Sequence, residues 1–318
     1  MRIIIYGAGA IGNVVGGYLA KAGHEVVLIG RPGHVKAVKE NGLRLVTPEN
    51  TYTLKIPAVT GPGEIQFSKD DAVFLSMKGQ NTEEALDDLK KAAPEVPVFC
   101  FQNGVRNEEI AAALFKDVYS VMVTVGAKYI KEGEVIAPFS APGLLIMGKY
   151  PRGTDEVLES AANALRIAGF TVTTTPDVMS YKWGKLVENL GNAVDAITDA
   201  NRSEINDIIK GVRDEAKAIL LKAGIDWKPQ HEVLKEYPSI IPPQGITKFE
   251  GSTWQSLSRK QGTVETGFLN GEIVRVAKRL GTKAPVNENL QSIVEQMAAN
   301  QELPGKYKPA QLRSMLGL

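Results

Sequence analysis

The chain has 318 residues, of which 43% are hydrophobic and 23% are charged, and its formal net charge at neutral pH is +1. This composition is typical of a soluble globular protein and excludes disordered and fibrous classes. Because lysine and arginine are balanced by acidic residues, the charge gives no sign of binding to nucleic acid or to an anionic membrane.

The first half of the chain predicts a parallel sheet with crossover helices, because short β-rich runs alternate with helix-like segments up to about residue 175. The expected strands are residues 2–6, 25–29, 72–76, 96–101, 118–124 and 143–147, and the expected helices are residues 11–22 and 82–92. The length of the chain suits two domains. We therefore expect an α/β, Rossmann-type NADPH-binding domain over residues 1–175.

The second half predicts helices, because strand signals largely disappear after Pro176. Long helices are expected over residues 178–198, 205–223 and 264–280, with a proline-rich loop over residues 237–243. No stretch of about 20 apolar residues predicts a membrane span. Residues 176–318 are thus expected to form an all-helical domain that carries substrate binding and catalysis.

A glycine-rich turn joins the first expected strand to the first expected helix. Its sequence is Gly7-Ala8-Gly9-Ala10-Ile11-Gly12. This is the G-x-G-x-x-G pattern in the strand–turn–helix context that dinucleotide binding requires. Gly7 permits the tight turn, Gly9 lets the backbone approach a pyrophosphate, and Gly12 lets the helix pack closely on the strand. Free amides at the start of the helix would then bind the negative charge.

The end of the second expected strand, Ile29-Gly30-Arg31, indicates which nicotinamide cofactor is used. NAD enzymes place a carboxylate there to hold the ribose 2′-hydroxyl, whereas this chain has Arg31. A guanidinium can hold a 2′-phosphate through paired hydrogen bonds. The sequence therefore favours NADPH, and a solvated loop arginine is the alternative.

Two loops follow later strands at the edge of the sheet where ligands bind in such folds. Lys78 follows one strand and could approach oxygens of the cofactor or substrate. Gln102 and Asn103 follow the next, and the Asn103 amide could bridge nicotinamide and substrate because it both donates and accepts hydrogen bonds. An ordinary Asn-Gly turn is the alternative for this second loop.

The expected helix over residues 178–198 carries a polar row opposite an apolar stripe. Lys185, Asn189 and Asn192 stand at i, i+4 and i+7 and share one face. Hydride addition to a ketone leaves charge on its oxygen, and Lys185 could protonate that oxygen. The asparagines could hold the other substrate oxygens. A solvated helix face is the alternative, although asparagine is a poor helix former.

Polar residues near the last expected helix add further candidates. Ser252 and Thr253 could donate hydroxyl groups to a substrate carboxylate. Glu265 lies near the expected helix start and could orient Lys185 or bind a substrate hydroxyl. Ordinary helix capping is the alternative for this glutamate.

These motifs resemble, in their order along the chain, the ketopantoate reductase family. They are the glycine turn, Lys78, Gln102-Asn103-Gly104, Gly126-Ala127, Lys185 with Asn189, and Glu265 followed by Asn270-Gly271. The family reduces 2-dehydropantoate to (R)-pantoate with NADPH in pantothenate synthesis, which supplies coenzyme A. The resemblance implies a Rossmann domain followed by a helical domain like that of 6-phosphogluconate dehydrogenase, with the active site between them. It also implies that Lys185 donates the proton and that Ala127, like Asn103, Lys78 and Glu265, contacts cofactor or substrate.

Three departures from the family pattern leave the identity of the 2-oxo acid open. Ala193 stands where a second asparagine is common, Gly267 replaces a frequent aspartate, and the serine-rich motif is altered to Ser252-Thr253-Trp254-Gln255. The alternatives are a related NADPH reductase acting on another 2-oxo acid or an imine derived from one, and a non-catalytic NADPH-binding regulator.

Cysteine content and apolar surface positions bear on the cellular setting and the assembly of the chain. The single cysteine, Cys100, cannot form an internal disulfide, and no cysteine–histidine cluster has metal-ligand spacing. We therefore expect a cytoplasmic protein without a metal site. Apolar positions on the C-terminal helices suit either a homodimer interface or the core of the domain itself.

Overall fold

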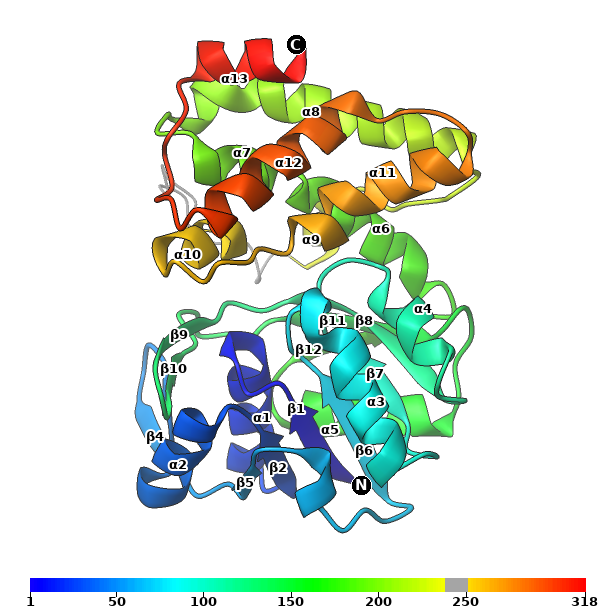
Figure 1. Ribbon diagram of the computed structural model, residues 1–318. Helices are drawn as coiled ribbons and strands as arrows, with labels where there is room; N and C mark the ends of the chain where they lie inside the picture. Colours follow the sequence, from blue (N-terminus) through cyan, green and yellow to red (C-terminus); the bar gives the residue numbers. More distant parts are fainter. Residues whose placement is uncertain (238–250) are drawn as a thin grey trace. The chain divides into compact units, whose positions relative to one another are not determined.

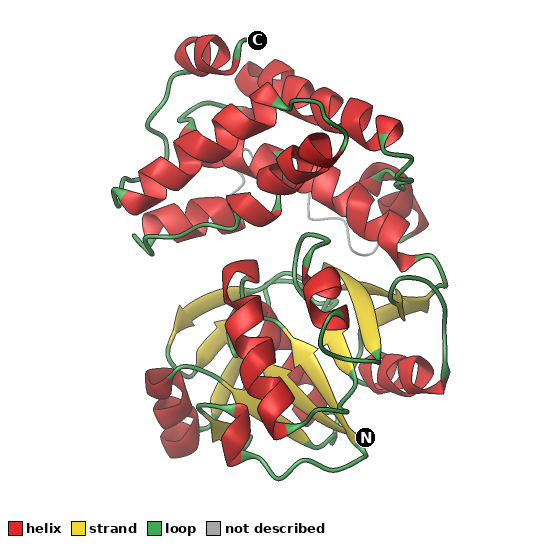
Figure 2. Cartoon of the chain, turned by 45° about the vertical axis from the view of Figure 1, so that its right-hand side comes forward, coloured by secondary structure: helices red, strands yellow, loops and turns green. Residues whose placement is uncertain are grey.

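The computed structural model describes residues 1–237 and 251–318 (Figure 1). Most of the expected proline-rich loop lies outside the described residues. The chain forms two compact units, of which the first contains residues 1–181 and 234–237 and the second residues 182–233 and 251–318. They divide inside helix α6 (Val178–Asn189), shortly after the boundary expected from the sequence. Figure 2 shows the strands in the first unit and helices in the second.

The main sheet of the first unit has eight strands in the order β5-β2-β1-β6-β7-β8-β11-β12. The strands are β1 (Arg2–Tyr6), β2 (Val26–Ile29), β5 (Ala58–Val59), β6 (Asp71–Leu75), β7 (Val98–Cys100), β8 (Val118–Thr124), β11 (Leu144–Lys149) and β12 (Thr171–Thr174). The first six of that order are parallel, which gives the Rossmann order 3-2-1-4-5-6. Strand β11 is antiparallel to β8 and extends the sheet.

Helices cover both faces of this sheet, because successive side chains of a strand point to opposite sides. Helices α1 (Ala10–Lys21), α2 (Pro32–Asn41) and α5 (Glu156–Ile167) share a core with Ile3 and Ile5. Helices α3 (Thr82–Ala92) and α4 (Asn107–Ala112) share the opposite core with Ile4. The only cysteine, Cys100, is 0% exposed within this second core.

A smaller sheet, which the sequence did not predict, packs on α1. Its order is β4-β3-β10-β9, formed by β3 (Leu43–Val46), β4 (Thr51–Leu54), β9 (Lys128–Lys131) and β10 (Glu134–Ile136). Leu43 and Leu45 lie so close to Gly17 of α1 that a side chain there would touch both. Three short 3-10 turns complete the described chain: η1 (Pro62–Glu64), η2 (Gly79–Asn81) and η4 (Thr266–Phe268).

The second unit is built from helices. Besides α6 these are α7 (Gly191–Ile197), α8 (Arg202–Lys222), α9 (Gln230–Glu236), which crosses the unit boundary, α10 (Ser252–Ser258), α11 (Asn270–Arg279), α12 (Pro285–Ala299) and α13 (Pro309–Leu316). The expected fold class, a Rossmann-type α/β domain followed by an all-helical domain, is confirmed. Within the described ranges, no helix combines the length and apolar character needed to cross a membrane.

Two expected helices of this unit were wrong in extent. The helix expected over residues 178–198 is interrupted at Leu190, between α6 and α7. The Arg213 guanidinium donates a 2.7 Å hydrogen bond to the Glu188 carbonyl oxygen, which a continuous helix would offer to the Asn192 amide. The helix expected from residue 264 begins only at Asn270, after the turn η4.

Candidate functional site

The glycine-rich turn of the first unit has the geometry that its sequence predicts. Gly7 has a φ of +110°, a backbone conformation that residues other than glycine rarely adopt. A Cβ atom at Gly7 would overlap with the Met77 backbone, and one at Gly12 would overlap with the Gly7 carbonyl oxygen and the Ser76 hydroxyl. These two glycines are therefore required by close packing between the turn, α1 and the end of β6.

Gly9 differs from the other two because none of the described residues comes close enough to require a glycine there. Its φ of −93° is open to any residue, and a Cβ atom would meet only the Gly7 carbonyl oxygen, at 3.9 Å. The space beside Gly9 is therefore free for a ligand to approach the backbone. The first amides of α1 have no partner within the helix, as at any helix start. This arrangement fits the pyrophosphate of a dinucleotide.

Arg31 lies at the carboxyl end of β2, in the N-cap position of α2. Its side chain is exposed, and none of the described residues holds the guanidinium in a hydrogen bond or ion pair. Such a guanidinium is available to a phosphate group at the adenosine ribose.

The loop after β7 is stabilised by a chain of hydrogen bonds made by buried side chains. Gln102 is buried, and its amide nitrogen donates a 2.7 Å hydrogen bond to the Thr82 hydroxyl, which in turn donates to Asn107. The Asn107 amide nitrogen donates to the Asn103 carbonyl oxygen at 3.0 Å. The Gln102 side chain thus stabilises the loop, and the half-buried side chain of Asn103 is the one left to meet a ligand.

Lys78 and Ala127 lie on two further loops of the same unit. Lys78 is half-buried at the N-cap of η2, directly after the end of β6. Ala127 is half-buried between β8 and β9 and packs on the core. The adjacent Gly126 lies against the Phe139 ring, which leaves no room there for a side chain.

In the second unit, Lys185 lies in α6 with its side chain half-buried. The loss of hydration around its ammonium and, to a smaller extent, the nearby charge of Lys182 together lower the pKa of Lys185 to about 7. A lysine with this pKa exchanges its proton near neutral pH, as a general acid must. Lys185 is the described residue with the clearest signature of acid–base chemistry.

The polar row expected around Lys185 is divided between two helices. Asn189 stands one turn after Lys185 in α6, whereas Asn192 lies in the first turn of α7, beyond the interruption. Both asparagine side chains are half-buried. The spacing of i, i+4 and i+7 therefore does not describe one continuous helical face.

The remaining candidates of this unit lie on α10 and before α11. Ser252 is exposed in the first turn of α10, and Thr253 is buried. Helix α10 packs against α7, so the structure brings Thr253 and Asn192 onto neighbouring helices (Figure 1). Glu265 is half-buried at the N-cap of η4, not in a first helical turn as expected.

Gly184, next to Lys185, was missed from the sequence. A Cβ atom at Gly184 would overlap with the Lys228 carbonyl oxygen, so this glycine lets the segment before α9 lie directly on α6. A glycine inside a helix is the signal that could have revealed this contact, because it is destabilising unless packing requires it.

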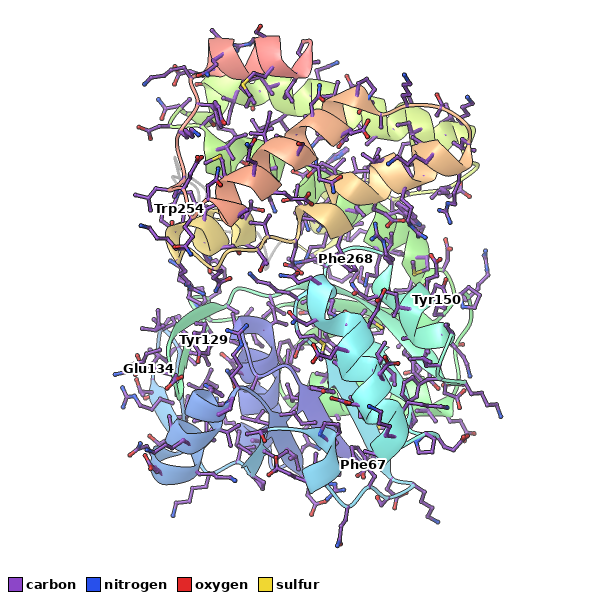
Figure 3. All side chains as sticks on the ribbon, viewed as in Figure 1. Phe67, Tyr129, Glu134, Tyr150, Trp254 and Phe268 are labelled. Atoms are coloured by element: carbon purple, nitrogen blue, oxygen red, sulfur yellow. The ribbon has the colours of Figure 1, made fainter. Side chains whose placement is uncertain are left out.

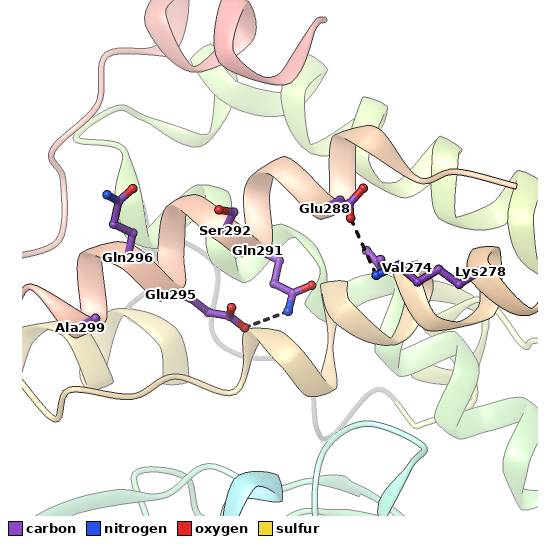
Figure 4. Close-up of a pocket in the computed structure, with 8 residues that line it drawn as sticks. All are labelled: Val274, Lys278, Glu288, Gln291, Ser292, Glu295, Gln296 and Ala299. Carbon is purple, nitrogen blue, oxygen red and sulfur yellow. Dashed lines mark hydrogen bonds and ion pairs between the residues drawn. The ribbon is translucent and has the colours of Figure 1, made fainter.

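An open groove of about 560 Å³ lies between α11 and α12 (Figure 4). Its lining includes Lys278, which is 3.9 Å from Glu288, and Gln291, which donates to Glu295 at 2.9 Å. None of the expected site residues lines this groove.

Comparison with known proteins identifies the family of the chain. The ketopantoate reductase PanE/ApbA model matches residues 3–152, and the model of the C-terminal domain of the same family matches residues 177–298. The chain is 31% identical to 2-dehydropantoate 2-reductase of Pyrococcus horikoshii over 97% of its own length and 100% of that protein. It is 29% identical to the Archaeoglobus fulgidus protein of the same name over 92% and 96%, respectively.

Solved structures agree with this result. A PanE/ApbA family ketopantoate reductase from Ralstonia eutropha JMP134 has a TM-score of 0.81 and 30% identity, with 95% of this chain and 99% of that chain covered. D-mandelate dehydrogenase, solved with NADH and anilino(oxo)acetate, has a TM-score of 0.81, 23% identity and coverage of 95% and 99%. At that identity the second likeness concerns the fold alone.

The strand order and the open glycine turn define a Rossmann-type dinucleotide-binding protein with a helical C-terminal domain. The matches over both domains go further: the chain belongs to the ketopantoate reductase family of oxidoreductases.

Proposed function

We propose that the chain reduces 2-dehydropantoate to (R)-pantoate with NADPH, and that Lys185 donates the proton. The observation that carries this proposal is the half-buried Lys185 with a pKa of about 7, one helical turn before Asn189. The names of the relatives from P. horikoshii and A. fulgidus support the choice of substrate.

The proton transfer follows from the chemistry of the side chains. A bound reduced nicotinamide supplies the hydride to the carbonyl carbon. Lys185 holds a proton on Nζ and delivers it to the carbonyl oxygen as negative charge develops there. The amides of Asn189 and Asn192 and the hydroxyls of Ser252 and Thr253 bind the remaining substrate oxygens. Glu265 orients Lys185 or binds a substrate hydroxyl.

The proposed preference for NADPH depends on the first unit. The open space beside Gly9 suits the pyrophosphate, and the unpaired guanidinium of Arg31 suits a 2′-phosphate. Lys78, Asn103 and Ala127 stand on the loops after the strands, where the rest of such a cofactor binds. Gln102 contributes by stabilising its loop.

The substitution Lys185→Ala tests the proton donor. Turnover of 2-dehydropantoate should fall roughly 10²-fold or more, because general acid catalysis contributes on this scale. NADPH affinity, measured by fluorescence titration, should change little. Lys210→Ala is the matched control, since the Lys210 side chain is 76% exposed on α8. Unchanged turnover in the Lys185 variant would remove the proposed acid.

Reduction of a different 2-oxo acid is the second candidate. The altered motif at Ser252 and Thr253 favours it, and D-mandelate dehydrogenase shares the fold. NADPH and NADH oxidation assays against 2-dehydropantoate, phenylglyoxylate and simple 2-oxo acids distinguish the two. No rate on 2-dehydropantoate together with a rate on another acid would select this second candidate. A non-catalytic regulator has less support, because Lys185, Asn189 and Glu265 are all present.

We also propose a setting for this activity. Reduction of 2-dehydropantoate would place the chain in pantothenate and coenzyme A synthesis, in the cytoplasm, where the thiol of its single cysteine remains reduced. Light scattering of the whole chain will determine whether it forms a homodimer.

A further inference from the structure

A buried histidine links the surroundings of Arg31 to the small sheet. His34 lies in the first turn of α2 and is 2% exposed. Its Nδ1 accepts a 3.1 Å hydrogen bond from the backbone amide of Gly133, in the turn between β9 and β10. Tyr129 lies on β9 (Figure 3). Its hydroxyl is 3.2 Å from the same nitrogen. Because a nitrogen that accepts from a backbone amide carries no proton, the ring proton is on Nε2.

The other nitrogen of the His34 ring, Nε2, is connected to the glycine-rich turn through Asn13. Nε2 of His34 lies 3.1 Å from the Asn13 side-chain oxygen and donates to it. The Asn13 amide nitrogen donates a 2.8 Å hydrogen bond to the Ala8 carbonyl oxygen. Asn13 is 0% exposed, so both of these bonds are shielded from water. His34 and Asn13 thus form a directed relay from the hairpin to the pyrophosphate turn.

The packing around the relay leaves little freedom for the segments it connects. A Cβ atom at Gly30 would lie 3.0 Å from the Ala8 side chain and 3.4 Å from the His34 ring. One at Gly33 would overlap with the Glu132 carboxylate of the hairpin. The amides of Gly7 and Ala8 both donate to the Ile29 carbonyl oxygen at 3.0 Å. The glycine turn, the segment around Arg31 and the hairpin therefore meet at His34.

The environment of His34 favours the uncharged ring that the relay needs. Burial lowers the pKa of His34 and outweighs the opposing effect of the Glu132 carboxylate. A protonated ring would direct an N–H group at the Gly133 amide, and this repulsion would break the link to the hairpin.

We propose that His34 and Asn13 are positioning residues for the adenosine end of the cofactor. NADPH carries its pyrophosphate and its 2′-phosphate on one ribose unit, so the two anion sites of the protein must keep a fixed separation. The relay joins the glycine-rich turn, which would bind the pyrophosphate, to the start of α2, which would present Arg31 to the 2′-phosphate. This inference rests on the proposed use of NADPH.

Two near-isosteric substitutions of His34 distinguish the hydrogen bond of Nε2 from that of Nδ1. In His34→Gln the amide nitrogen can take the place of Nε2 and still donate to Asn13, whereas His34→Asn can replace only the Nδ1 acceptor. The affinity of the full chain for adenosine 2′,5′-bisphosphate, measured by calorimetry, should fall roughly tenfold in His34→Asn and stay near wild type in His34→Gln. Asn13→Ala should match His34→Asn, and the double variant should be no weaker than either. His231→Gln is the control, because that side chain is 71% exposed.

Steady-state kinetics provide the second measurement. The KM for NADPH should rise in His34→Asn while kcat at saturating NADPH stays unchanged, because the relay does not touch the reacting groups. Equal affinities in all variants would overturn the inference. So would an equal loss in both His34 variants, which would indicate a general packing role. A wild-type chain that binds neither NADPH nor NADH would instead overturn the proposed function itself.

Discussion

At the scale of single residues, Lys185 predicts opposite pH dependences for the two directions of the reaction. Its pKa is about 7, and a proton donor must be protonated, so kcat/KM for reduction should fall about tenfold per pH unit above pH 7. Oxidation of the 2-hydroxy acid needs the neutral amine, so its rate should rise with pH up to about pH 7 and level off above it. Rates measured in both directions between pH 6 and 9 test this.

The control for this pH dependence is Lys185→Arg. A guanidinium stays protonated at all these pH values, so any residual reduction should lose its decline above pH 7. A wild-type reduction profile that stays flat through pH 7 and declines only near pH 10 would contradict the assignment.

Arg31 predicts the choice between the two nicotinamide cofactors. Arg31→Ala should raise the KM for NADPH roughly tenfold or more, because hydrogen bonds between charged groups contribute about 1.5–3 kcal/mol each. The KM for NADH should change little. Arg152→Ala, another exposed arginine of the same unit, serves as the control. Equal increases in the KM for NADPH and the KM for NADH would show that Arg31 does not bind the 2′-phosphate.

At the scale of secondary structure, the interruption between α6 and α7 depends on Arg213. Arg213→Met removes the donor to the Glu188 carbonyl oxygen and the 2.6 Å ion pair with the Glu188 carboxylate. We expect the KM for the 2-oxo acid to rise roughly tenfold, since Asn192 would lose its position, while NADPH affinity is retained. Steady-state kinetics with each substrate varied in turn measure this.

Arg313→Met is the matched control, because Arg313 likewise binds a backbone carbonyl oxygen, that of Glu204, and a carboxylate, that of Asp207. Both variants should lose stability, but only the Arg213 variant should lose substrate affinity. An equal KM in the two variants would contradict a role of the interruption in substrate binding.

The same interruption shows where local patterns fail as predictors. Apolar spacing over residues 178–198 is regular and therefore predicts one helix, although Gly191 and the asparagines on either side of Leu190 are poor helix formers. Arg213, on α8, takes the Glu188 carbonyl oxygen as its acceptor, and such a contact between helices is not visible in the local pattern. The small sheet was missed for a similar reason, since β3 and β10 pair across a long sequence separation and their strands are short.

At the scale of the whole molecule, the sequence predicted the fold well because the parallel sheet is buried on both faces. Its strands are continuous apolar runs, and the glycine turn marks the first crossover. The candidate site was predicted by residue type and order. The sequence also suggested that burial would lower the pKa of Lys185, and the structure supplies the value of about 7. It could not supply the hydrogen bonds of Gln102 within its own loop or the open space beside Gly9, because both depend on packing.

The positions of the tryptophans allow the unfolding of the two units to be followed separately, with and without cofactor. Trp183, Trp227 and Trp254 all belong to the second unit, so their fluorescence reports its unfolding, whereas circular dichroism reports both units. NADP⁺ at about 100 times its Kd should stabilise the first unit by about 2.7 kcal/mol and raise the denaturant midpoint seen by circular dichroism. Gly9→Val should fold normally, because a Cβ atom there meets only the Gly7 carbonyl oxygen, at an ordinary contact distance of 3.9 Å, but should show no such rise.

The enclosed position of Cys100 has a practical consequence. Its thiol lies at the last residue of β7 with no surface exposed, so maleimide reagents should leave the folded wild-type chain unlabelled. A pair of cysteines introduced on the exterior, one in each unit, would then be the sole attachment points for spectroscopic probes. Energy transfer between such probes would follow any rearrangement of the two units during a catalytic cycle without first removing a native residue.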